Sequence, residues 1–315
     1  MINENVLFII GAGASVDYGF PSGEKLINDI ISKLDDGNFG EDLYGTFPTS
    51  KKQIRSFREH IEAARLESID LWLRRNPSYS QIGRICIADE ILKCEREYTR
   101  VNGWFESFWR KMVNGIHSFN ELCNSPPNNI LFITFNYDRM IEKLYYDALN
   151  ATFFEQISQI NNKEANILRI IGPKSAIRHV YGKCGELEWQ AKDNKSVCKF
   201  GGELSGGNLV EVANNISFLG QNNKNTDYYK LISNFRPKKI FFLGFGFGEE
   251  NLELLSKRED FDIILSDEKE IYGTSIGLSQ KRINDIKEDI SKRFYTTNVN
   301  IIPKIKCNEL LNEYL

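Results

Sequence analysis

The stretch Val6–Ser15, with the sequence VLFIIGAGAS, decides the fold that we expect for this chain. Its apolar residues run directly into two glycines one residue apart, a pattern typical of a buried strand that ends in a tight turn before a helix. Such a turn can direct backbone N–H groups and the positive end of the helix toward a phosphate. A strict dinucleotide-binding fingerprint would need a third glycine at position 16, where this chain has Val, and no Gly-Lys-Ser/Thr follows. The loop alone therefore fits either a nucleotide site or a plain strand-to-helix turn.

Further apolar runs of strand length lie at 129–135, 238–245, 270–278 and 299–303. They are nearly continuous in Val, Ile, Leu and Phe instead of alternating with polar residues, which indicates strands buried on both faces of a parallel sheet. Helical patterns follow several of these runs directly. We therefore predict an α/β protein with a Rossmann-like, doubly wound parallel sheet.

The long segment between the first two apolar runs carries no strand pattern. Its apolar residues recur at helical spacing, as at Phe105, Phe108 and Met112. We predict that 1–26 and 128–315 form one discontinuous sheet domain, with 27–127 as an inserted helical module and 124–129 as its return linker. From Gly182 to Asp227 the chain is rich in Gly, Asn and Lys, which predicts a mobile lid or a disordered segment.

Composition limits the possible partners and compartments. The chain has 40 basic and 43 acidic residues and a formal charge of −3, so it lacks the basic surface of a duplex-binding protein, and we expect no direct contact with nucleic acid. No signal-peptide pattern and no apolar run of roughly 18 residues is present, so we expect a cytoplasmic protein without a membrane span. The six cysteines form no CxxC pair, which indicates reduced thiols and no metal site.

Polar side chains follow the second apolar run in TFNYDR, Thr134–Arg139. In open α/β sheets ligands bind at the carboxyl ends of the strands, where Asn136 and Asp138 would lie. An amide both donates and accepts hydrogen bonds, so it could hold a ribose hydroxyl and a water together. Alternatively, Asn136 or Asp138 simply caps the following helix.

Two later segments carry further candidates. In RHVYGKCGEL, Arg178–Leu187, His179 precedes a glycine turn and could serve as a general base, although a lone histidine is more often structural. The segments LGFGFGEEN, 243–251, and YGTSIGLS, 272–279, are glycine turns after apolar runs. Each could present backbone N–H groups to a phosphate or an adenosine ribose, or could be only a turn.

Taken in this order, the motifs resemble the sirtuin-like family of NAD-dependent proteins. The loop Gly11–Ser15 followed by Gly19-Phe20-Pro21, the pair Asn136 and Asp138, a histidine near a glycine, and a late glycine-rich segment carry the resemblance. It implies NAD as the substrate and Asn136, Asp138 and His179 as catalytic residues. It implies cofactor contacts from Gly11, Ala12, Gly13, Ser15, Phe20, Pro21, Tyr181, Gly244, Gly246, Thr274 and Ser275, with Phe20 and Pro21 in a mobile flap over the nicotinamide.

The chain departs from deacylating sirtuins in two respects. It lacks their four-cysteine zinc module, and its helical segment instead resembles bacterial sirtuin-like effectors of antiphage defence. That resemblance implies an oligomeric NAD glycohydrolase, which converts NAD to ADP-ribose and nicotinamide, and which acts with a HerA-type hexameric ATPase or, alternatively, a short Argonaute-type sensor. The second departure is at the catalytic histidine, whose position before Gly182 holds Tyr181, while His179 lies two residues earlier on the same strand face.

Two other functions stay open at this point. Tyr181 at the histidine position slightly favours a non-catalytic subunit that binds or senses NAD or ADP-ribose. A protein deacylase or ADP-ribosyltransferase is disfavoured because the zinc ligands are missing.

Overall fold

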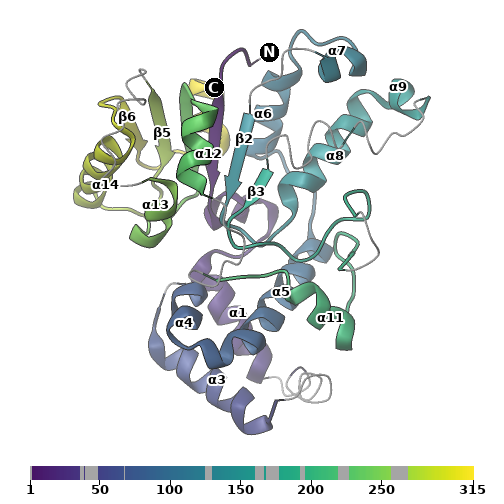
Figure 1. The fold of residues 1–315 in the computed structure, drawn as a ribbon, viewed down its shortest axis with the longest axis vertical. Coiled ribbons are helices and arrows are strands. Elements are labelled where there is room, and N and C mark those ends of the chain that lie inside the picture. The colour runs from purple at the N-terminus through teal and green to yellow at the C-terminus, as the bar shows by residue number, and fades with distance from the viewer. Residues whose placement is uncertain are drawn as a thin grey trace.

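A single parallel sheet forms the centre of the protein (Figure 1). The computed structural model describes residues 2–35, 39, 49–66, 68–124, 130–159, 167, 177–191, 196–218, 227–256 and 269–315. The strands are β1 (Val6–Ile10), β2 (Ile130–Thr134), β3 (Ile177–His179), β4 (Lys239–Leu243), β5 (Glu270–Thr274) and β6 (Val299–Ile302). Their order, β3-β2-β1-β4-β5-β6, is that of a Rossmann-like doubly wound sheet and confirms the predicted fold class.

Aromatic rings stack across the middle of the sheet and fix its register. Phe8 of β1 is paired with Phe132 of β2 and Phe241 of β4, and the ring centroids are 4.9 and 5.5 Å apart. Tyr272 of β5 continues the row at 5.4 Å from Phe241, and Tyr314 stacks on Tyr272 at 4.5 Å. A slip of one residue would move a strand's ring to the other face, so this row specifies the pairing.

Helices cover both faces of the sheet. On the face with the aromatic row, Phe108 of α6 meets Phe8 at 5.5 Å, and Tyr145 of α8 also lies against this cluster. On the opposite face, Phe294 of α14 packs on Phe242 of β4. The described helices are α1 (Gly23–Asp35), α3 (Lys51–Ala64), α4 (Ile69–Arg75), α5 (Ser80–Glu97), α6 (Trp104–Val113), α7 (Phe119–Asn124), α8 (Met140–Thr152), α9 (Phe154–Ser158), α11 (Gly206–Ala213), α12 (Tyr228–Phe235), α13 (Glu249–Leu255), α14 (Gln280–Phe294) and α15 (Cys307–Tyr314).

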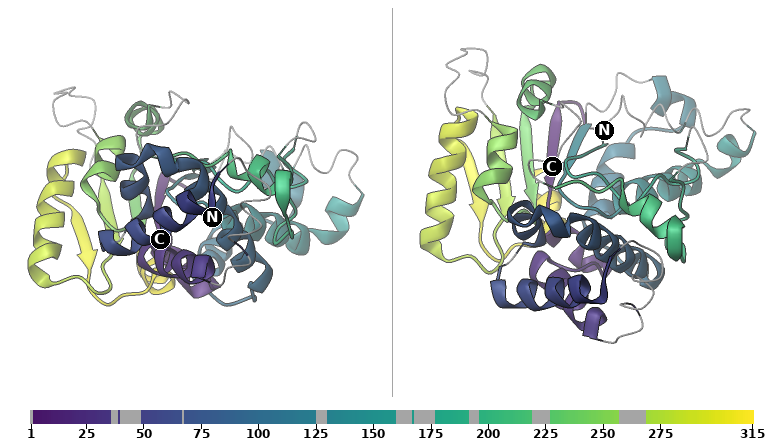
Figure 2. Two further views of the ribbon diagram at one scale, coloured as in Figure 1. Left: turned by 90° about the horizontal axis from the view of Figure 1, so that it is seen from below. Right: turned by 60° about the horizontal axis from the view of Figure 1, so that its bottom comes forward.

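A helical lobe made of α1, α3, α4, α5 and α11 lies beyond the ends toward which β1 and β2 point (Figure 1). Seen from below, the purple and blue helices of this lobe lie in front of the central strands and leave α14 uncovered at one side (Figure 2). Helix α11 follows β3 in sequence, yet Gln81 of α5 bonds Asn214 at its end at 3.2 Å, and Arg84 of α5 lies over the ring of Phe218. Helix α6, within the predicted module 27–127, packs instead on the sheet. The domain boundaries at 26 and 128 stay a prediction.

The strand expected around His179 is present as β3, although it was not among the apolar runs. Its three residues are only half-buried at the edge of the sheet and lack a continuous apolar run. Strand β1 ends where its apolar run ends, and β2, β4, β5 and β6 end one to four residues before the predicted runs do, where the chain turns at the carboxyl edge.

The segment 182–227, predicted as a mobile lid or a disordered segment, packs against the rest of the protein where it is described. Residues 196–218 pack against α5 and α8, and the carbonyl of Cys198 accepts a hydrogen bond from the buried Arg139. Residues 192–195 and 219–226, and most of the predicted linker, 125–129, lie outside the described residues. No disulfide joins any of the six cysteines, all of which lie in the described ranges, and no helix within those ranges has the length and apolar character of a membrane span.

Candidate ligand site at the carboxyl edge of the sheet

The loop after β1 packs directly against the loop after β4. The amides of Gly11 and Gly13 donate to the carbonyls of Leu243 and Gly244, each at 3.0 Å. A Cβ atom at Gly11 would lie 2.6 Å from the Gly244 oxygen, and one at Gly13 would lie 2.9 Å from the Gly244 Cα. Gly244 itself has a φ of +54°, and its Cβ would lie 2.0 Å from the Ala14 nitrogen. The contact between the two loops therefore explains why positions 11, 13 and 244 are glycines, because a Cβ atom at any of them would collide with the facing backbone.

Consequently, only some of the loop's N–H groups remain for a ligand. The Gly11 and Gly13 amides are already bonded to the β4 loop, although Gly13 is exposed. Within the described parts of the chain, the amides of Ala12, Val16 and Asp17 have no acceptor. These three amides are the N–H groups of the loop that remain able to donate to a phosphate.

A buried triangle of polar side chains joins this loop to the segment after β2. The Ser15 hydroxyl donates to Asp138 Oδ2 at 2.9 Å and accepts from Asn136 Nδ2 at 3.0 Å. Asn136 Nδ2 also donates to the Gly11 carbonyl at 3.2 Å. Asp138 Oδ1 accepts the amide of Met140, the first residue of α8, at 3.1 Å, whereas the N-cap position of that helix is Arg139, without a side-chain cap. Two segments more than 120 residues apart thus form one site.

The carboxyl group of Asp138 is held in an unusual state. Burial raises its pKa to about 6, although the hydrogen bonds from Ser15 and Met140 oppose part of this rise. A carboxyl with such a pKa changes protonation close to neutral pH, as groups in ligand sites often do.

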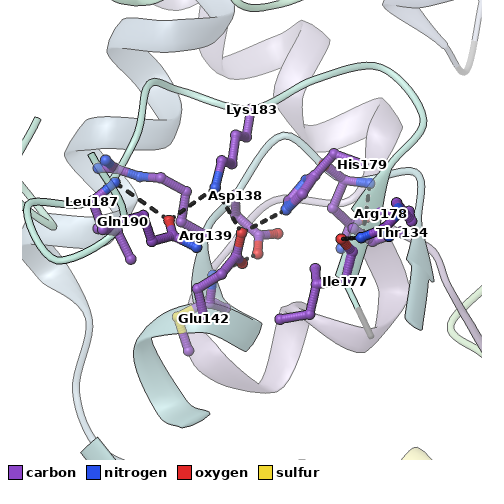
Figure 3. A network of polar contacts seen from close by, with 12 residues as sticks. Thr134, Asp138, Arg139, Glu142, Ile177, Arg178, His179, Lys183, Leu187 and Gln190 are labelled. Carbon is purple, nitrogen blue, oxygen red and sulfur yellow. Dashed lines mark hydrogen bonds and ion pairs between the residues drawn. The ribbon is translucent and has the colours of Figure 1, made fainter. Parts of the chain in front are cut away.

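His179, at the end of β3, contacts the same segment through both ring nitrogens. Its Nδ1 lies 3.1 Å from the Asn136 carbonyl oxygen, and its Nε2 lies 2.9 Å from Glu142 Oε1 (Figure 3). Lys183 Nζ approaches the same Glu142 oxygen at 3.1 Å from the other side. Burial would raise the pKa of Glu142, but the charges of Lys183 and His179 outweigh it, and the pKa is lowered. Glu142 is therefore an ionised carboxylate inside the protein.

The hydroxyl of Tyr181 also has a partner inside the protein. It donates to Asn251 Oδ1 at 2.5 Å, and burial raises the pKa of the phenol. The ring lies beside that of Tyr137, whose hydroxyl donates to Asp70 at the start of α4. Burial raises the pKa of Asp70 to about 7. The helical lobe thus contributes a carboxyl group to this edge of the sheet.

The expected flap residues lie in a well-packed part of the structure. Phe20 and Pro21 are buried, and the Phe20 amide donates to the Ser15 carbonyl at 3.2 Å. The indole of Trp104 in α6 holds the same loop through the Ala14 carbonyl at 3.0 Å. Movement of Phe20 and Pro21 as a flap stays a prediction.

The turns after β4 and β5 contain one residue that supports the fold, Thr274, and two that the fold does not explain, Gly246 and Ser275. Thr274 Oγ1 accepts the Gly244 amide at 2.9 Å and so supports the contact between the loops. Ser275 Oγ is buried without a hydrogen-bond partner in the described structure. A Cβ at Gly246 would meet nothing within 4 Å, and this glycine is exposed. The contacts within the described structure therefore do not explain why residue 246 is a glycine or why the Ser275 hydroxyl is buried.

Sequence reasoning missed three charged residues at this edge, namely Asp70, Glu142 and Lys183. Each stands in a polar or helical stretch that reads as solvent-exposed, so the sequence carries no signal for their burial.

In the described ranges, no group of three or more His, Cys, Asp or Glu side chains could hold a metal ion. No protein-family model matches the chain, and no curated protein matches it. Fold and site together define a Rossmann-like α/β protein with a polar, buried cluster where β1 and β2 end.

Proposed function

We propose that this protein is an NAD glycohydrolase that converts NAD to ADP-ribose and nicotinamide. The observation that carries the proposal is the Ser15 hydroxyl, which binds both Asn136 and Asp138 and so joins the glycine loop to the polar segment after β2. The strand order reverses between β1 and β4, and ligands of doubly wound sheets bind at the carboxyl ends beside such a point.

Asn136 has one group available for chemistry. Both hydrogens of its amide are committed, to the Gly11 carbonyl and to the Ser15 hydroxyl, so Oδ1 is the atom that can accept from a ribose hydroxyl or a water. We assign Asn136 to orienting the nicotinamide ribose and the attacking water. Asp138 holds Ser15 in place or accepts from a ribose hydroxyl.

The chemical step makes modest demands on the protein. The bond between ribose C1′ and the nicotinamide nitrogen breaks, its electron pair passes to the cationic ring, and nicotinamide leaves as a neutral molecule. Water then bonds to C1′ and loses a proton, through a transition state of oxocarbenium character. Correct orientation of the ribose and the water supplies most of the acceleration. The Ala12 amide, the turn at Gly246 and the Ser275 hydroxyl are the groups we assign to the phosphates and the adenosine side.

The test is a time course of nicotinamide release from NAD by the purified chain, alone and with a co-expressed HerA-type ATPase. We expect Asn136→Ala to lower the rate by about 100-fold, because a misplaced ribose or water costs on that order. The matched control is Asn150→Ala on α8, where the amide donates only to the Tyr146 carbonyl of its own helix at 2.7 Å. NAD that stays intact under both conditions would overturn the proposal.

The role in antiphage defence, by depletion of NAD, belongs to the same proposal. It is supported by the resemblance of the helical segments to bacterial sirtuin-like effectors, and so are a homo-oligomer and an ATPase partner. Co-purification of a tagged chain with the co-expressed ATPase, followed by mass measurement of the complex, tests the partner. Recovery of the tagged chain alone would speak against it.

A second function, binding of NAD or ADP-ribose without turnover, is favoured by one specific observation. Both nitrogens of His179 and the hydroxyl of Tyr181 already have partners inside the protein, so neither side chain presents a vacant base. Calorimetry that detects tight NAD binding by the assembled complex, without nicotinamide release, would favour this function over hydrolysis.

A further inference from the structure

The buried ionic cluster of Glu142, His179 and Lys183 lies directly behind the candidate site (Figure 3). Their side chains are 1, 8 and 14 % exposed, so water contributes little to solvating the charges. Burying an ionised carboxylate is costly unless cations and hydrogen bonds compensate for the lost water. Such a cluster at the edge of the sheet therefore needs a reason beyond the stability of the fold.

The contacts of His179 determine where its protons are. Glu142 is ionised and can only accept, and the Asn136 carbonyl can only accept. The ring satisfies both partners only when both of its nitrogens carry a hydrogen. In that state it has no lone pair, so it cannot take a proton from a ribose hydroxyl or a water.

The same contacts fix the backbone at Asn136 from every side. Its amide donates to Thr134 Oγ1 at 3.1 Å, and its carbonyl accepts from His179 Nδ1 at 3.1 Å. Its side-chain nitrogen is bonded to Gly11 and Ser15. Among its contacts with the described residues, Oδ1 is the polar atom of Asn136 that is left for a ligand, and its direction depends on these bonds.

For NAD hydrolysis, and therefore resting on the proposed function, we infer that His179 and Glu142 are positioning residues for Asn136, with Lys183 as the counter-ion of Glu142. The general-base role predicted from the sequence for His179 is replaced in this assignment. Among the described residues, the other charged groups beside the cluster are Glu186, 2.9 Å from Lys183, and Asp138, which interacts electrostatically with His179.

Substitutions at His179 separate a positioning role from a base. In His179→Asn the side-chain amide can take the place of Nδ1–H and still donate to the Asn136 carbonyl, although it cannot act as a base. We expect His179→Asn to keep kcat within about tenfold of the native value, and His179→Ala to lose about 100-fold, with a smaller change in KM. Equal losses in both variants would overturn the positioning role in favour of a base.

A second measurement does not depend on activity. Hydrogen exchange followed by mass spectrometry reports the opening of the segment 134–139 in the whole protein without NAD. We expect His179→Ala and Glu142→Gln to exchange about tenfold faster in this segment, and His179→Asn to restore slow exchange. His60→Ala is the matched control, since His60 is exposed on α3 and bonds only to its own helix.

The two arms distinguish the possible failures. Unchanged exchange in both His179→Ala and Glu142→Gln would overturn the positioning role, whether or not NAD is hydrolysed. Faster exchange together with intact NAD would retain the positioning of Asn136 and remove only the glycohydrolase. If His179→Ala fails to fold, Glu142→Gln keeps the shape of the side chain and decides the question.

Discussion

Replacement of Ser15 by Ala tests the triangle that joins the two halves of the site. The change removes one buried hydroxyl, which donates to Asp138 at 2.9 Å and accepts from Asn136 at 3.0 Å. A hydrogen bond to an ionised group contributes about 1.5–3 kcal/mol to stability, against about 0.5–1.5 kcal/mol for one between neutral groups. The free energy lost on substitution should therefore depend on the protonation of Asp138.

The sign of this pH dependence follows from the raised pKa. The Asp138 carboxyl has a pKa of about 6 in the folded protein, above the value of about 3.9 expected when unfolded. The folded state thus binds the proton more tightly, and this contribution to stability is lost as the pH rises through about 6. Because the bond from Ser15 lowers the pKa of Asp138, Ser15→Ala should raise this pKa further. The variant should lose about 1 kcal/mol near pH 5 and about 2–3 kcal/mol near pH 8.

Urea unfolding at these two pH values, followed by tryptophan fluorescence, measures the difference. The control is Ser107→Ala in α6, which removes a buried serine hydroxyl outside the triangle. Equal losses at both pH values, or a larger loss at the lower one, would refute the description of Asp138 as a carboxyl that Ser15 stabilises in its ionised form.

Three further predictions concern the loops and the buried charges. Gly244→Ala should prevent stable folding or cost more than about 3 kcal/mol, since its Cβ would lie 2.0 Å from a backbone nitrogen of the glycine loop; a melting curve near the native one would contradict this. Gly246→Ala should leave the melting temperature almost unchanged but weaken NAD binding severalfold in calorimetry, whereas Gly207→Ala, equally open on α11, should alter neither. Glu95→Ala should cost about 3–5 kcal/mol in chemical unfolding, because it leaves the fully buried Arg139 without its carboxylate at 2.5 Å; a loss below about 1 kcal/mol would mean that the pair is not needed.

The glycine loop illustrates a feature whose chemistry the sequence could indicate only in part. Two glycines after a buried strand predicted a tight turn, which is present, and N–H groups directed at a phosphate, which stays a prediction; the structure shows in addition a close approach of another backbone. The approaching backbone, however, is that of Gly244 in the loop after β4. A residue more than 200 positions away cannot be inferred from a local motif, so the free N–H groups at Ala12, Val16 and Asp17 emerged only from the fold.

The sequence by itself determined the central strands and the place of the site. Strands β1, β2, β4 and β5 are buried along almost their whole length, so their apolar runs are continuous and recognisable. In a parallel sheet all carboxyl ends meet at one edge, and this alone placed Asn136 and Asp138 near the glycine loop. The short edge strand β3 carried no such pattern.

Only the tertiary structure decided how the charged residues act. Glu142 and Lys183 read as polar residues of a helix and a loop, yet the fold directs the Glu142 carboxylate at His179 and the Lys183 ammonium at Glu142. Asp70 reaches the site from the helical lobe by the same kind of contact with Tyr137. The burial of a strand can be recognised in the sequence, because nearly every residue of a buried strand is apolar. The pairing of two buried charges depends on the distance between the elements that carry them, and only the folded structure sets that distance.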